Sequence, residues 1–76
     1  MMTKKDKKIL EDAERDGIPI FILIAKDELS VNAIASYCSD CEAMGCSAEH
    51  VDAIEARIKE FNAWQTLYPD KCKLPD

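Results

Sequence analysis

The longest apolar run of the sequence covers residues 18–25, and its last seven residues read Pro-Ile-Phe-Ile-Leu-Ile-Ala. β-Branched and aromatic residues dominate this run. It is short and bounded by charged residues, which favours a β-strand over a helix. Because apolar residues occupy consecutive rather than alternate positions, both faces of such a strand need cover. We therefore predict one short apolar strand at about residues 19–25.

A single strand cannot form a sheet alone, because its backbone N–H and C=O groups need hydrogen-bond partners. Residues 71–74 alternate charged and apolar side chains, which suits a short C-terminal edge strand, and equally a loose tail. The other source of a partner is a second copy of the chain, paired along residues 19–25. The interface candidates in this run are Ile20, Phe21, Ile22, Leu23 and Ile24.

Three helices are predicted around this strand, at about residues 3–15, 31–44 and 48–67. Ser30 and Ser47 are the expected N-caps of the second and third helices. The third helix carries one stripe of large apolar residues and a second face of smaller ones, so it should pack on two neighbours. The predicted fold class is α+β and mostly helical.

With 76 residues, the chain has room for one small domain, residues 1–76, in which residues 1–8 can fray. A domain of this size buries only about 60% of the surface that its unfolded chain exposes, so its stability as a monomer should be marginal. Small domains commonly gain stability from a metal, from disulfides or from a second copy of themselves. A homodimer joined through the strand or through the third helix is therefore expected, with another protein as the alternative partner. The interface candidates on the third helix and just beyond it are Trp64, Leu67 and Tyr68.

Charge and hydropathy exclude several classes of protein. The chain is acidic, with a net charge of −5, and its one basic cluster lies at residues 4–8, where a solvated helix end is the usual role. Nucleic-acid binding is therefore not expected. The apolar run is too short to span a bilayer, and no signal-peptide core follows the first lysines. We expect a cytoplasmic protein with no membrane association, whose thiols stay reduced.

Three cysteines and the only histidine follow one another as Cys38-x2-Cys41-x4-Cys46-x3-His50. Zinc binds four such ligands tetrahedrally, so a small zinc-stabilised domain, with His50 or Cys72 as the fourth ligand, is the alternative interpretation. The preferred interpretation is packing, with no metal and no cofactor. Cys38 and Cys41 lie on the apolar stripe of the second helix, and Cys46 lies at a tight helix corner where a small apolar side chain packs.

Catalysis is not expected from this sequence. It has no glycine-rich phosphate loop and no nucleophile–base pair, and its carboxylates are spaced as ordinary polar helix faces. We therefore predict a non-enzymatic protein-interaction module.

Several short segments together resemble a known group of proteins. These segments are residues 19–29, 63–65, 69–71 and 73–76, which read PIFILIAKDEL, AWQ, PDK and KLPD. In this pattern a short apolar segment precedes Asp-x-Leu and two helices, and the chain closes on a Trp-Gln…Pro…Leu-Pro-Asp tail. Over residues 19–76 the chain thus resembles a family of small, uncharacterised bacterial and phage proteins. The resemblance implies an accessory role linked to a phage or another mobile element, and it does not include the cysteines.

Overall fold

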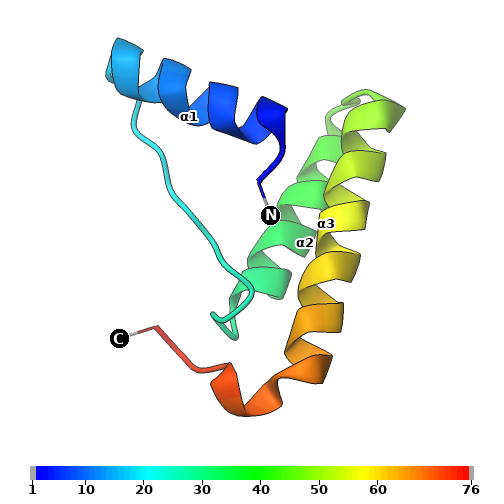
Figure 1. Cartoon of the computed structure of the whole chain (residues 1–76). Helices are drawn as coiled ribbons and strands as arrows, with labels where there is room; N and C mark the ends of the chain where they lie inside the picture. Colours follow the sequence, from blue (N-terminus) through cyan, green and yellow to red (C-terminus); the bar gives the residue numbers. More distant parts are fainter. Residues whose placement is uncertain (1, 76) are drawn as a thin grey trace.

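The computed structural model describes residues 2–75, which form three α-helices and one short 3₁₀ helix. The helices are α1 (Lys4–Asp16), α2 (Ser30–Ala43), α3 (Ala48–Leu67) and the 3₁₀ helix η1 (Pro69–Lys71). Figure 1 shows α2 and α3 side by side as an antiparallel hairpin, while α1 lies to one side of it. The prediction of a mostly helical chain with three helices is confirmed.

The core lies between α2 and α3. Cys38 and Cys41 of α2 are buried against Ile54 of α3. Because residues three apart lie on the same face of a helix, the two cysteines present a continuous apolar strip to α3. Three half-buried apolar side chains pack around them: Ile34, Val51 and Ile58.

A tight corner joins α2 to α3. Gly45 has a φ of 77°, a left-handed conformation that glycine adopts without the steric cost of a Cβ. The N–H of Cys46 donates to the carbonyl of Cys41 (2.9 Å), which closes the end of α2. At the next residue, the hydroxyl of Ser47 accepts the N–H of His50 (3.2 Å), which caps α3 as predicted.

Ser30 does not cap α2 as predicted. It is the first residue of the helix and is fully buried, and its hydroxyl donates to the carbonyl of Asp27 (2.7 Å). The carboxylate of Asp27 accepts the N–H of Leu29 (2.8 Å). A turn built by the Asp27 side chain therefore precedes the helix in place of a serine cap.

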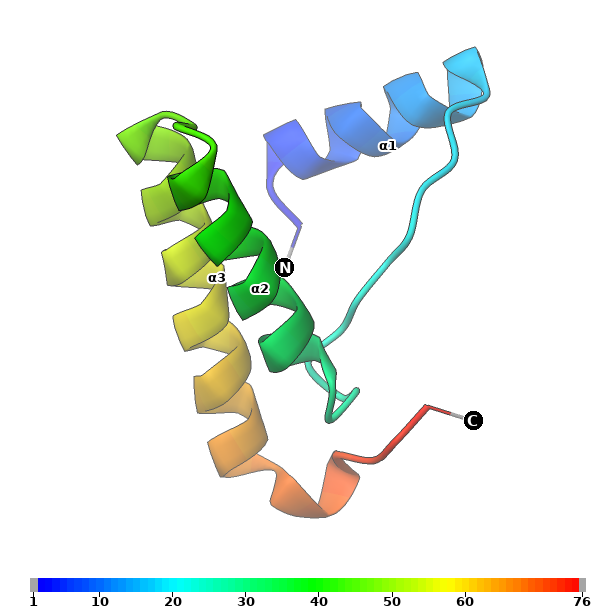
Figure 2. The same ribbon diagram turned by 180° about the vertical axis from the view of Figure 1, so that it is seen from behind.

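The N-terminal helix is well capped but stands apart from the hairpin. The hydroxyl of Thr3 accepts the N–H of Asp6 (3.1 Å), the Asp6 carboxylate accepts the N–H of Thr3 (3.3 Å), and Gly17 ends the helix with a φ of 66°. No Cα of α1 lies within 8 Å of a Cα of α2 or α3. Figure 2 shows the same separation from behind. We call residues 2–25, which comprise α1 and the segment after it, the N-terminal arm.

The strand predicted at residues 19–25 is not formed. Residues 18–24 have no regular secondary structure. They run as an extended segment from α1 to the end of the hairpin where α2 begins (Figure 1). The strand predicted at residues 71–74 is reduced to an isolated parallel bridge between Asp27 and Lys73.

The position of the C-terminal tail explains why neither of the two predicted strands is formed. The N–H of Lys73 donates to the carbonyl of Lys26 (3.0 Å), and the N–H of Glu28 donates to the carbonyl of Lys73 (3.0 Å). The tail therefore pairs with the turn that follows the apolar run rather than with the run itself. Without a neighbouring strand among the described residues, residues 19–25 cannot form a ladder.

Candidate interaction surface

Residues 18–24 of the apolar run are largely exposed. The side chain of Phe21 is 86% exposed and that of Ile22 is 65% exposed. Ile18, Ile20 and Ile24 are each more than half exposed, whereas Leu23 is half-buried. Contiguous exposed apolar side chains of this kind usually mark a binding surface. The five interface candidates of the run thus lie together on one extended segment.

The backbone of this run makes hydrogen bonds to other described residues at its two ends but none between them. At one end the N–H of Ile18 donates to the carbonyl of Ala13 (2.9 Å), and at the other the carbonyl of Ile24 accepts the N–H of Asp27 (3.1 Å). Between them, residues 19–23 make no backbone hydrogen bond to any other described residue. Such an unpaired segment can accept a further strand.

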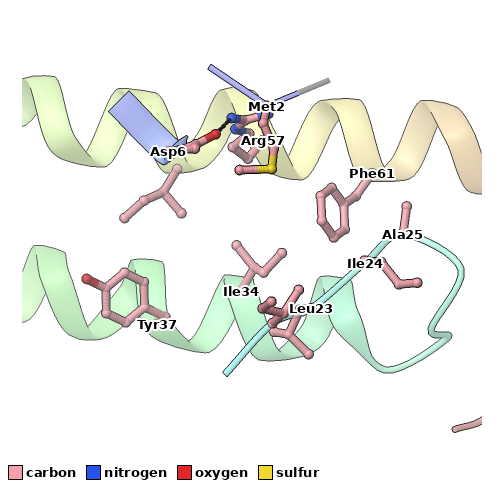
Figure 3. A pocket seen from close by; sticks show the side chains of 11 residues that line it. Met2, Asp6, Leu23, Ile24, Ala25, Ile34, Tyr37, Arg57 and Phe61 are labelled. Atoms are coloured by element: carbon pink, nitrogen blue, oxygen red, sulfur yellow. Dashed lines mark hydrogen bonds and ion pairs between the residues drawn. The ribbon is translucent and has the colours of Figure 1, made fainter. Parts of the chain in front are cut away.

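An apolar hollow of about 600 Å³ opens between the arm and the hairpin. Figure 3 shows Leu23 and Ile24 of the arm on one side, with Ile34 of α2 and Phe61 of α3 facing the same space. Met2 and Asp6, at the start of the arm, also line this hollow. The arm therefore has apolar surface on its inner side as well as along the run.

One ion pair connects α1 to the hairpin, between Asp6 and Arg57 (Figure 3). The backbone N–H of Thr3 lowers the pKa of the Asp6 carboxyl, and the charge of Arg57 lowers it further. Arg57 also donates to Glu60 (3.2 Å). The side chains of Arg57 and Asp6 are 34% and 39% exposed. Because ion pairs at such exposed positions contribute little stability, this contact holds α1 against the hairpin only weakly.

The α3 candidates lie at the C-terminal end of that helix. Trp64 is half-buried and its ring lies 5.1 Å from that of Tyr68, while Leu67 is 73% exposed. The ammonium of Lys71 lies 4.9 Å from the centre of the Tyr68 ring. Trp64 and Tyr68 therefore already have partners within the chain, and this patch is smaller than the apolar run.

The predicted zinc ligands do not converge on one point. The one group of potential ligand atoms within 4.8 Å of one another, among the described residues, joins Cys38 to Glu42 and Glu55. Burial raises the pKa of the Cys38 thiol, and the charges of Glu42 and Glu55 raise it further. Glu42 lies one helical turn from Cys38, so sequence spacing could have indicated it, whereas Glu55 approaches only because α3 packs on α2.

The remaining cysteines and His50 have other contacts. The side chain of Cys46 interacts with that of Cys41, which raises the pKa of the Cys46 thiol. The Tyr37 hydroxyl lies 3.3 Å from Nε2 of His50. The thiol of Cys72 donates to the carbonyl of Tyr68 (3.4 Å). The raised pKa values of the Cys38 and Cys46 thiols disfavour their thiolates, the form in which cysteine binds metals and reacts.

We expect the substitution Cys41→Ala to lower the free energy of unfolding by about 1–2 kcal/mol, because it leaves a small cavity in the core. Addition of a chelator should leave the helical circular dichroism signal unchanged. Urea titration of both proteins, with and without EDTA, measures these effects. Loss of the fold in EDTA would instead support the zinc-stabilised domain.

Comparisons with known proteins add no assignment. No family model matches the chain, and neither a curated protein nor a solved structure matches it. Among the described residues, no helix has the length and apolar character needed to cross a bilayer.

Proposed function

We propose that this chain is a non-enzymatic protein-interaction module that assembles as a homodimer through its apolar run. The observation that carries the proposal is the exposed segment at residues 18–24, of which residues 19–23 make no backbone hydrogen bond to another described residue. Two chemical facts favour binding over catalysis. The walls of the hollow are mainly apolar, and Asp6 and Arg57, the charged side chains that line it, already neutralise each other.

The surface area supports assembly. The single chain exposes 6219 Å², whereas the usual scaling gives about 4,700 Å² for a folded monomer of 8.6 kDa. Its radius of gyration of 13.7 Å likewise exceeds the value of about 11.4 Å expected for a compact chain of this length. The excess of about 1,500 Å² is what one partner contributes to a large, permanent homodimer interface.

A second copy is the partner best suited to this surface. The run from residue 18 to residue 25 contains no charged side chain, so two copies can approach there despite the net charge of −5. A phage- or mobile-element-linked accessory role rests on the sequence resemblance alone and forms a separate part of the proposal.

Sedimentation equilibrium at tens of micromolar tests the dimer directly. We expect a mass of about 17 kDa, twice that of the 8.6 kDa chain. Dilution should give a reversible monomer–dimer equilibrium rather than higher aggregates, because a two-fold interface is closed. A mass of one chain at all concentrations would contradict the proposal.

A further inference from the structure

We propose that two copies pair their apolar runs as antiparallel strands about a two-fold axis at Phe21, so that Phe21 faces its own copy at a position without backbone hydrogen bonds. This inference rests on the proposed homodimer and specifies its geometry. It completes the strand that the single chain does not form.

The proline in the run constrains the register. In an antiparallel pair, hydrogen-bonded and non-hydrogen-bonded positions alternate. A two-fold axis perpendicular to the strands requires one residue to face its own copy. If Phe21 occupied a hydrogen-bonded position, Pro19 would face Leu23 at another such position, where it has no N–H to donate. With Phe21 at a non-hydrogen-bonded position, Pro19 needs no donor.

The free backbone groups match this register. Ile20 then exchanges two hydrogen bonds with Ile22 of the second copy, and Ile22 exchanges two with Ile20 of the second copy. Both residues have unpaired N–H and C=O groups in the single chain. The next hydrogen-bonded position would need the N–H of Ile18 and the carbonyl of Ile24, which Ala13 and Asp27 already occupy. The ladder therefore ends where the unpaired segment ends.

The backbone also separates this register from its nearest competitor. An axis at Ile22, also at a non-hydrogen-bonded position, would pair Phe21 with Leu23 of the second copy through hydrogen bonds. It would place Pro19 opposite Ala25 at the next hydrogen-bonded position, where Pro19 has no N–H and the Ala25 carbonyl already accepts the Gln65 side-chain amide (2.9 Å). An axis at Phe21 instead keeps Pro19 at a position that needs no backbone hydrogen bond.

Disulfide cross-linking distinguishes these two axes. Residues that face their own copy at a non-hydrogen-bonded position lie about 4.5 Å apart between Cα atoms, within the range that a disulfide spans. In a background with Cys46→Ser and Cys72→Ser, which removes the accessible thiols, Phe21→Cys should form a covalent dimer in oxidised glutathione. Ile22→Cys, one position along, is the matched control and should cross-link at least about ten times more slowly. A faster reaction of Ile22→Cys would overturn the proposal.

Proline substitutions test, without thiol chemistry, which residues of the run donate backbone hydrogen bonds to the second copy. Ile22→Pro removes an N–H that the proposed ladder uses, whereas Leu23→Pro removes one that points away from it. We expect Ile22→Pro to sediment as a monomer and Leu23→Pro to remain dimeric. Both positions lie outside the helices, so the helical circular dichroism signal reports whether each variant folds.

The outcomes separate this inference from the proposed function. A dimeric wild type whose Ile22→Pro and Leu23→Pro variants are both dimeric would overturn the strand pairing but leave the homodimer in place. A monomeric wild type would overturn both. A dimer lost with Leu23→Pro but kept with Ile22→Pro would contradict the axis at Phe21.

Discussion

The variant Phe21→Asp should be monomeric at concentrations where the wild type is a dimer. Each copy would lose the burial of one phenylalanine, worth about 2 kcal/mol, and the effect counts twice in a two-fold interface. The total of about 4 kcal/mol corresponds to a dissociation constant raised about 1,000-fold. Two carboxylates would also face each other across the axis, which adds repulsion. Sedimentation equilibrium over a concentration series measures the change.

Leu67→Asp is the matched control for this variant. Leu67 is 73% exposed and lies at the end of α3, so the substitution introduces the same charge on a similarly accessible apolar residue outside the run. We expect its dissociation constant to stay within about threefold of the wild-type value, which corresponds to the ±0.5 kcal/mol typical of surface changes. A monomeric Leu67→Asp together with a dimeric Phe21→Asp would place the interface on α3, the other site that the sequence indicated.

The largest loss of stability is expected from Ile54→Ala. Ile54 is 8% exposed and contacts the buried cysteines of α2, so its truncation removes buried apolar area and leaves a cavity in the one core between α2 and α3. The expected cost is about 2–4 kcal/mol. A domain of this size has a total free energy of unfolding of only about 4–11 kcal/mol. The midpoint of thermal unfolding should therefore fall by more than about 10 °C.

Met44→Ala provides the comparison for this second variant. Met44 is 83% exposed at the end of α2, and its truncation should change the free energy of unfolding by less than about 0.5 kcal/mol. Both variants are to be melted at one fixed concentration, because dimerisation makes the midpoint depend on concentration. Equal stability of the two variants would show that the core does not lie at Ile54.

The helices and their ends could be predicted because their signals are local. The cap at Ser47 is formed as expected, and the Thr3–Asp6 capping box and the left-handed Gly17 and Gly45 are signals of the same local kind. Each depends on residues within a few positions along the chain. Ser30 differs because Asp27, three residues earlier, builds a competing turn and accepts the serine hydroxyl through its carbonyl.

The candidate site could be predicted only in part. Its apolar side chains were evident from the run itself, and the structure shows five of them more than half exposed. The Asp6–Arg57 ion pair joins residues that are 51 positions apart, and the hollow is lined by residues of the arm, α2 and α3, so no spacing rule indicates either of them. The same holds for Glu55 beside Cys38, which depends on how α3 packs on α2.

The amino-acid sequence by itself determined three helices, the Ser47 cap of α3 and one apolar run that needs cover on both faces, because hydrophobic spacing and capping act over short distances along the chain. Only the tertiary structure decided that the run lies exposed, since the position of the C-terminal tail, paired with the turn at Asp27, depends on contacts between distant segments. It also decided which backbone groups remain unpaired, and those groups define the pairing that we propose for a second copy.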